Sequence, residues 1–156
     1  MKKEHNYLTT IKWTGNIGKG TKDYRSYERS YDISVINKPE ILGSSDPAFS
    51  GDKSKHNPEE LLVASISSCH MLWYLHLCAV NGVNVLEYSD KAKGLMIELK
   101  SGSGQFSKVE LNPEVVVSDE AMVEKANELH KQANKLCFIA NSLNFKVDHN
   151  PKCTVK

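Results

Sequence analysis

Four cysteines are the side chains of this chain best able to do chemistry: Cys69, Cys78, Cys137 and Cys153. A thiolate can attack an electrophile, bind a metal or be oxidised. Four cysteines among 156 residues are too few for a disulfide framework. No apolar stretch of the kind found in secretory signals follows the polar N-terminal residues. We therefore expect a cytoplasmic chain whose cysteines are either reactive or simply buried.

A metal site near Cys69 is not expected. Cys69, His70, His76 and Cys78 fall in one predicted helix, where each residue turns about 100° and rises about 1.5 Å. Cys78 is therefore roughly 13 Å from Cys69 and on the opposite side, which excludes a disulfide between them. His76 shares a face with Cys69 but lies about 10 Å away, too far for a shared metal ion. His130 is expected on the surface, and Cys69 alone would be taken for a core cysteine.

The predicted helix around Cys69 begins with Asn57 as N-cap and Pro58 as first residue. Glu59 and Glu60 complement the dipole at its start, and Gly82 can end it.

The segment 61–86 has no Asp, Glu, Lys or Arg, so it is long enough to cross a bilayer. Its serines, histidines and asparagines make it only moderately apolar, and no basic cluster flanks it, so we favour a buried helix of a soluble protein. A helix without a charged face must be covered on every side. This indicates a wrapping sheet and a partner subunit.

The remaining pattern predicts an α+β domain. A second helix, capped by Ser118, carries a stripe of apolar residues at spacings of four and three, and Cys137 lies at its end. Strands are expected at residues 7–13, 21–36, 84–100, 105–117 and 143–148. Strands clustered around two helices favour α+β over a parallel sheet, and the length predicts a single domain over 1–156.

The composition excludes several classes of protein. The chain is 40% hydrophobic and 25% charged, with a net charge of +1. These values are ordinary for a soluble globular protein. A basic footprint for nucleic acid and a polybasic block for an anionic membrane surface are both missing from the sequence, so neither partner is expected.

Two cysteine motifs resemble the signature of the OsmC/Ohr family, the osmotically inducible and organic hydroperoxide resistance proteins. That signature is Asn-Pro-Glu, a helix rich in small residues, and a Cys ten residues after the Glu; the chain reads Asn57-Pro-Glu-Glu-Leu-Leu-Val-Ala-Ser-Ile-Ser-Ser-Cys69. The family's second Cys lies near the end of the second long helix, where the chain reads Leu136-Cys137-Phe-Ile-Ala-Asn-Ser142. Phe138 stands where the family has Pro.

The resemblance implies a fold and an assembly. The fold has antiparallel sheets wrapped around two long central helices in an intertwined homodimer, with active sites at the subunit interface. Glu59 and Cys69 are about 15 Å apart along one helix and not on one face. A carboxylate that acts near the thiol must therefore be supplied by another element or by the second chain.

The activity implied by the resemblance is reduction of hydroperoxides, organic ones in preference to hydrogen peroxide. Cys69 would attack the O–O bond and Cys137 would resolve the product as a disulfide. A dithiol of lipoyl type or another dithiol would then reduce the disulfide. Glu59 matches the Glu that holds a cationic Arg beside the reactive thiol in the family. This chemistry requires no cofactor and no metal.

The position of the cationic side chain departs from one branch of the family. The loop Asp46-Pro-Ala-Phe-Ser-Gly51, which would carry Arg in the OsmC branch, has none. The Ohr branch has its Arg in the N-terminal hairpin region, closer to Arg25. We favour Arg25; Arg29, four residues on in the same predicted strand, is the competitor, and both can instead be solvated.

These departures keep a second hypothesis open. The chain would then be a non-catalytic, stress-associated dimer that binds a small apolar ligand beside Cys69 and Trp73. A different thiol chemistry on the same scaffold is the third. The sequence assigns no role to Cys78 or Cys153.

Overall fold

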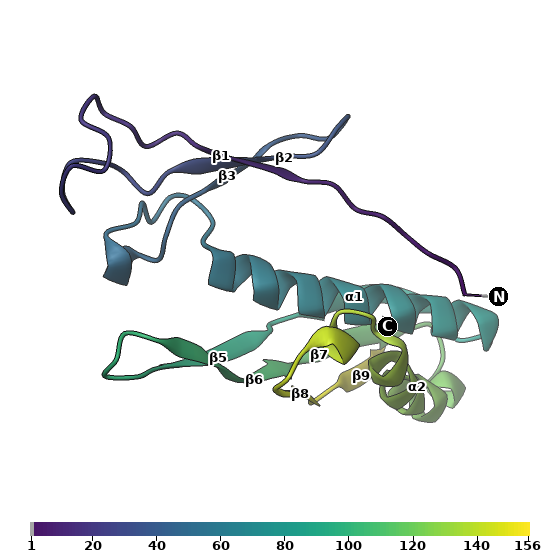
Figure 1. Cartoon of the computed structure of the whole chain (residues 1–156). Helices are drawn as coiled ribbons and strands as arrows, with labels where there is room; N and C mark the ends of the chain where they lie inside the picture. The colour runs from purple at the N-terminus through teal and green to yellow at the C-terminus, as the bar shows by residue number, and fades with distance from the viewer. Residues whose placement is uncertain (1) are drawn as a thin grey trace. The chain divides into compact units, whose positions relative to one another are not determined.

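A computed structural model describes residues 2–156, which form two compact units, one up to Leu61 and one from Leu62 onward. The helices are η1 (Pro47–Phe49), α1 (Pro58–Val80), η2 (Glu120–Met122), α2 (Val123–Leu136) and η3 (Ala140–Ser142), of which the η elements are 3₁₀ turns. Figure 1 labels α1 and α2. The strands are β1 (Thr10–Trp13), β2 (Tyr31–Ser34), β3 (Ile41–Gly43), β4 (Val85–Asp90), β5 (Lys93–Glu98), β6 (Gly104–Leu111), β7 (Pro113–Val117), β8 (Lys146–His149) and β9 (Lys152–Val155).

The N-terminal unit is built on an antiparallel sheet of order β1-β2-β3. Tyr31 of β2 lies between Trp13 of β1 and Gly43 of β3 in the register. A Cβ atom on Gly43 would lie 2.2 Å from the Tyr31 ring, so only glycine fits opposite this tyrosine.

The predicted strand over 21–36 is wrong for most of its length, because only Tyr31–Ser34 is paired as a strand. Side chains bind the backbone groups that a strand ladder would use. Trp13 Nε1 donates to the Glu28 carbonyl at 2.9 Å, and Arg29 donates to the carbonyls of Tyr27 and Tyr24 at 2.7 Å each. Residues 21–26 therefore fold as turns and bends, and Tyr27 forms only an isolated bridge to Asn16.

Helix α1 begins and ends where its local sequence predicts. Asn57 Oδ1 accepts from the Glu60 amide at 2.8 Å, and Glu60 Oε2 accepts from the Asn57 amide at 3.2 Å, which is a reciprocal capping box. At the other end Gly82 has φ +73°, and the Val83 amide donates to the Cys78 carbonyl at 2.9 Å.

The sides of α1 differ in burial. One side is buried through Ile66, His70 and Tyr74, whereas Leu72 and Val80 are exposed. Among the described residues α1 is also the one helix whose length and composition would allow it to cross a membrane, a test that core helices of soluble proteins pass as well.

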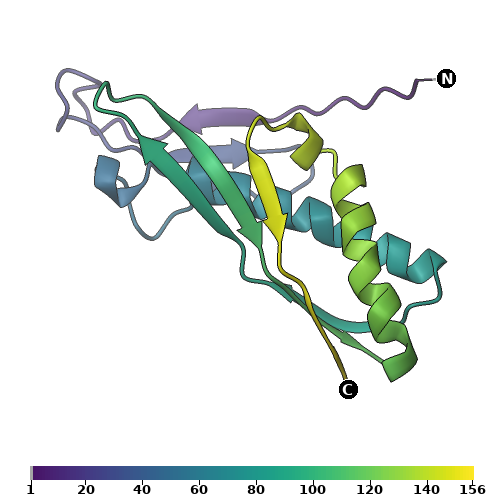
Figure 2. The same ribbon diagram turned by 90° about the horizontal axis from the view of Figure 1, so that it is seen from below.

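The C-terminal unit has two three-stranded sheets, of order β4-β7-β9 and β5-β6-β8 (Figure 2). β4 pairs with β7 and β5 with β6 in antiparallel fashion, but β8 and β9 are parallel to their neighbours β6 and β7. The expectation of antiparallel sheets therefore holds only in part.

A corner divides both of the long strands predicted in this unit. Asp90 Oδ1 accepts from the Asn112 amide at 2.7 Å, and Asn112 Nδ2 donates to the Lys91 carbonyl at 3.0 Å. These bonds end β4 and β6 at the same place. The predicted strand over 143–148 is β8, and β9 was not predicted.

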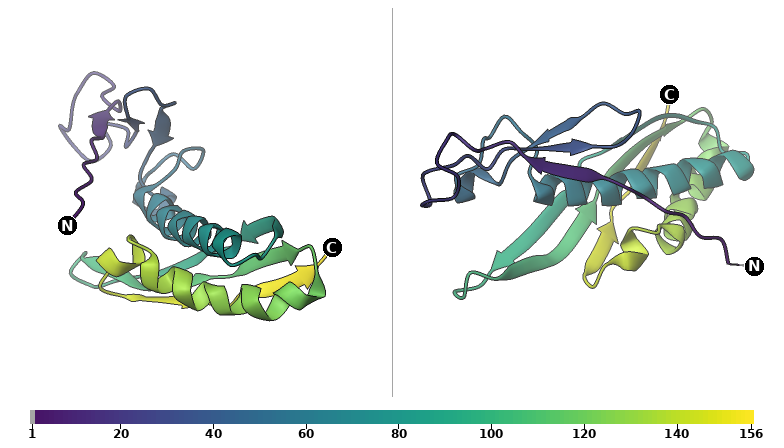
Figure 3. Two further views of the ribbon diagram at one scale, coloured as in Figure 1. Left: turned by 90° about the vertical axis from the view of Figure 1, so that its right-hand side faces the viewer. Right: turned by 45° about the horizontal axis from the view of Figure 1, so that its top comes forward.

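The core of the C-terminal unit consists of two apolar clusters. In one, Tyr74 and Leu77 of α1 pack with Val115 of β7 and Leu129 of α2; in the other, Ile66 packs with strand β6. Figure 3 shows α1 and α2 packed with the strands of this unit. Helix α2 starts later than predicted: Asp119, not Ser118, caps the 3₁₀ turn that precedes it, by accepting from the Ala121 amide.

Candidate active site

The structure brings Cys69 and Cys137 together in the C-terminal unit. Cys69 is half-buried in the middle of α1, and Cys137 is 1% exposed at the end of α2. Burial and the neighbouring Cys69 thiol raise the pKa of the Cys137 thiol to about 11. The Cys137 thiol therefore stays protonated at neutral pH. The pair has one accessible sulfur and one protected sulfur.

Backbone hydrogen bonds at the end of α2 fix the position of Cys137. Its amide donates to the Ala133 carbonyl at 3.0 Å, and its carbonyl accepts from the Asn141 amide at 3.0 Å. Its sulfur also accepts from the Ala140 amide at 3.4 Å. The chain thus turns around the sulfur, and Cys137 keeps its place without the proline of the family motif.

Aromatic side chains lie next to the thiol pair. Phe138 follows Cys137 and is exposed, and its ring meets the ring of Trp73 edge to face at 5.6 Å. Trp73 is one helical turn after Cys69 in α1. An open hollow of about 250 Å³ is lined by Leu72, Trp73 and His76. This surface can hold an apolar group close to the sulfurs.

Glu59 lies in the N-terminal unit, in the first turn of α1. Its Oε2 atom is buried and has no hydrogen-bond partner among the described residues. Burial and the charge of Glu59 raise the pKa of Tyr31. Glu60 makes the capping hydrogen bonds at this end of the helix. The buried Glu59 oxygen can therefore accept a hydrogen bond from another group.

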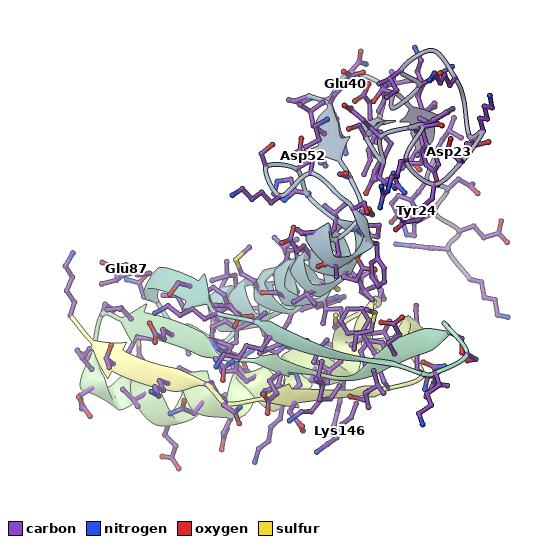
Figure 4. The ribbon with its side chains drawn as sticks, turned by 90° about the vertical axis from the view of Figure 1, so that its left-hand side faces the viewer. Asp23, Tyr24, Glu40, Asp52, Glu87 and Lys146 are labelled. Atoms are coloured by element: carbon purple, nitrogen blue, oxygen red, sulfur yellow. The ribbon has the colours of Figure 1, made fainter. Side chains whose placement is uncertain are left out.

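The two arginines have different environments, and neither lies on a strand. The expectation that Arg25 and Arg29 lie on one strand is therefore wrong. The Arg29 guanidinium lies over the rings of Tyr24 and Tyr27 at 4.2 and 4.3 Å, besides donating to both of their carbonyls. Arg25 is exposed, and its backbone amide donates to Asp23 at 2.9 Å. Figure 4 shows Asp23 and Tyr24 in this loop. Arg25 as the cation beside the thiol stays a prediction.

A buried histidine cluster was missed from the sequence. His130, expected on the surface, is 2% exposed, and its Nδ1 atom lies 3.0 Å from Nε2 of His70. The ring of His149 in β8 is centred 4.7 Å from that of His70, and Tyr74 stacks on His130 at 3.8 Å. The spacing of His130 from Ala126 and Ala133, by four and three, was the signal that placed it on the buried face of α2.

The histidines are held neutral. Burial and the neighbouring histidines lower the pKa of His70 to about 3 and that of His130 to about 4. Burial also lowers the pKa of His149, although Asp148 and Asp90 oppose the effect. Across residues 2–156, no group of three or more His, Cys, Asp or Glu side chains is arranged to hold a metal ion.

Comparisons with known proteins identify the family. The sequence model described as OsmC-like protein matches residues 51–152. An OsmC-like protein of unknown function from Vibrio cholerae O1 biovar eltor has a similar structure, with a TM-score of 0.86 and 28% identity over 96% of this chain and 100% of that chain. No curated protein shows a significant sequence match.

Two more distant structures share the fold. An organic hydroperoxide resistance protein from Elizabethkingia anophelis has a TM-score of 0.70 and 18% identity, covering 100% of this chain and 99% of that chain. An organic hydroperoxide resistance protein OsmC from Legionella pneumophila has a TM-score of 0.66 and 17% identity, covering 98% and 99%. With the family model matching well over half of its length, the chain belongs to the family of OsmC-like proteins.

Proposed function

We propose that the protein is a thiol-dependent peroxidase that reduces organic hydroperoxides, and hydrogen peroxide more weakly, in defence against oxidative stress. The observation that carries the proposal is that a half-buried Cys69 and a buried Cys137 are neighbours. Family membership and the resemblance of two distant neighbours' folds support it.

The proposed reaction has three balanced steps. The Cys69 thiolate attacks one oxygen of the O–O bond; with one proton taken up, an alcohol leaves and Cys69 becomes a sulfenic acid. The Cys137 thiol then attacks the sulfur of the sulfenic acid, which forms the Cys69–Cys137 disulfide and releases water. A dithiol reduces this disulfide by exchange and becomes a disulfide itself.

The environment of each sulfur suits its step. The raised pKa of Cys137 keeps its proton in place until Cys69 has been oxidised. The Trp73 and Phe138 rings offer an apolar surface to the organic group of the substrate. Arg25 is the proposed cation for the thiolate, and the buried Glu59 oxygen that lacks a partner among the described residues is the proposed acceptor for its guanidinium.

We further propose that the protein acts as a homodimer in the cytoplasm with a lipoyl-type or other dithiol as reductant. The exposed apolar side chains on α1, Leu72 and Val80, support a second chain as their cover. A dimer also provides a second copy of Glu59 and Arg25 for each thiol pair.

Peroxide consumption tests the proposal. Cumene hydroperoxide and hydrogen peroxide are each supplied with a dithiol to the wild type, to Cys69→Ser and to Cys153→Ser. We expect turnover that prefers the organic peroxide, is lost in Cys69→Ser and is kept in Cys153→Ser, since Cys153 is a similarly half-buried thiol outside the pair. A folded wild type without turnover, or equal turnover in Cys69→Ser, would falsify the proposal.

The aromatic hollow favours one alternative, a non-catalytic dimer that binds a small apolar ligand at Leu72, Trp73 and His76. This alternative predicts an unreactive Cys69 and a quench of Trp73 fluorescence on ligand binding. Retained binding in Cys69→Ser without peroxide turnover in the wild type would favour it.

A further inference from the structure

The His70–His130 contact is a direct hydrogen bond between two helices. The two facing nitrogens are 3.0 Å apart and the ring planes differ by 9°, as expected for a ring N–H that donates to a ring nitrogen in its plane. Both side chains are buried. Among residues 2–156, this is the one side-chain hydrogen bond that joins a residue of α1 to a residue of α2.

Each bonded histidine belongs to a helix that also carries one of the two thiols. His70 directly follows Cys69 in α1, and His130 precedes Cys137 by seven residues, which is two helical turns on the same face. The two helices are therefore bonded through the imidazoles in the core, and the thiols are neighbours at the end of α2.

The imidazole bond tolerates only some protonation states. One ring must supply an N–H and the other a lone pair, so the pair is stable when neutral or singly charged. If both rings are protonated, two N–H groups face each other and two charges repel inside the core.

The surroundings oppose a second proton on the pair. His149 of β8 is a third imidazole next to His70, and the neutral ring of Tyr74 covers His130. The carboxylates nearest the cluster, Asp90 of β4 and Asp148 of β8, act on His149. Tyr88 of β4 contacts Tyr74 and stays uncharged, because burial and the charge of Asp90 raise its pKa.

We propose that His70 and His130 are positioning residues that hold Cys137 against Cys69, and that protonation of both rings releases α2 and separates the thiols. This proposal rests on the proposed function, in which the Cys69–Cys137 disulfide is an intermediate of the peroxidase reaction. The pairing of the thiols can, however, be measured without any peroxide.

The test measures the equilibrium of the Cys69–Cys137 disulfide against reduced and oxidised dithiothreitol between about pH 7.5 and about pH 5, the range in which histidine titrates. The protein carries Cys78→Ser and Cys153→Ser so that two thiols remain, and a small selenol speeds exchange at acid pH. Alkylation and mass spectrometry give the oxidised fraction, and circular dichroism confirms that the protein stays folded. When the thiols of the protein and of dithiothreitol are both protonated, the exchange reaction neither takes up nor releases protons. The thiols therefore add no pH dependence of their own to the equilibrium.

The matched control is His70→Gln with His130→Asn. The Gln amide replaces Nε2 and the Asn amide replaces Nδ1, which keeps a neutral hydrogen bond that cannot be protonated. We expect the wild-type equilibrium to shift toward the dithiol by up to about tenfold per pH unit for each proton taken up on release. The control should show no such shift, and His130→Leu should favour the dithiol at every pH.

Equal pH dependence in the wild type and the control, or none in the wild type, would overturn the positioning role. So would a wild type that forms no Cys69–Cys137 disulfide at any pH, which would also remove the resolving step of the proposed function. A pH-dependent disulfide in a protein that consumes no hydroperoxide supports the positioning role and contradicts the peroxidase alone. The single variant His130→Asn serves if the double variant does not fold.

Discussion

Phe138 and Trp73 meet edge to face, with ring centroids 5.6 Å apart and planes at 87°. The contact joins the loop after α2 to the middle of α1, one residue from Cys137 and four residues from Cys69. The contact therefore packs the loop next to the buried Cys137 against α1, the helix that carries the accessible Cys69. Phe138 stands at the position where the OsmC/Ohr motif has proline.

Phe138→Ala should therefore loosen the thiol pair with little effect on the fold. An edge-to-face pair contributes about 1 kcal/mol beyond the area it buries, and Phe138 is exposed. We expect a loss of about 1 kcal/mol in urea unfolding and slower disulfide formation after peroxide addition. Leu136→Ala, an exposed apolar control on the other side of Cys137, should leave disulfide formation unchanged; equal slowing in both variants would contradict the role of the ring.

The two thiols should react very differently with alkylating reagents. A thiol whose pKa is raised to about 11 is almost fully protonated at about pH 8, and Cys137 is buried as well. We expect iodoacetamide to modify Cys69 well before Cys137 in the native protein, and both at similar rates in urea. Peptide mass spectrometry over time measures this order, and faster labelling of Cys137 would reverse the assignment of roles.

Arg25→Ala and Arg29→Ala should separate a chemical effect from a structural one. Arg29 binds two carbonyls and two rings within its own loop, whereas the Arg25 side chain is exposed. If Arg25 is the cation proposed for the Cys69 thiolate, Arg25→Ala should lower kcat/KM for cumene hydroperoxide by about tenfold or more, because a nearby positive charge favours the thiolate.

Arg29→Ala should instead lower the melting temperature while the activity per folded molecule is retained. The opposite pattern, with activity lost in Arg29→Ala and kept in Arg25→Ala, would make Arg29 the functional cation.

Gly43→Ala should destabilise the N-terminal sheet. A Cβ at this position would lie 2.2 Å from the ring of Tyr31, so the ring or the strand must move. Overpacking of this kind costs about 1–3 kcal/mol. Adding the same substitution to Tyr31→Ala should cost much less, and the double-mutant cycle from urea unfolding measures the difference. An additive cycle would show that the clash is not with this ring.

The protein should lose stability as the pH falls below about 6.5. The pKa values of His70 and His130 are lowered in the folded state, so above the ordinary value both rings are neutral whether folded or unfolded. Below it, the unfolded chain takes up protons that the folded chain cannot, down to the folded pKa values of about 3 and about 4.

We expect a loss of ~2 kcal/mol for each of these histidines at about pH 5. Urea unfolding at several pH values measures it, and the His70→Gln, His130→Asn variant should show a smaller acid sensitivity. A stability that is unchanged from about pH 7 to about pH 5 would contradict the buried, neutral state of the cluster.

The sequence alone determined the elements whose causes are local. The limits of α1 follow from Asn57, Glu60 and Gly82, because capping groups lie within a few residues of the backbone groups they bind. The spacing from Glu59 to Cys69 indicated the family, and the stripe on α2 predicted its buried face. These features need no knowledge of distant parts of the chain.

Only the tertiary structure decided the features that depend on distant partners. The long predicted strands of the C-terminal unit break because Asp90 binds an amide 22 residues away. His130 is buried because His70, 60 residues earlier, shares a hydrogen bond with it. A polar side chain in an otherwise apolar stripe is buried only where another part of the chain supplies a hydrogen-bond partner for it. No local sequence pattern encodes that partner.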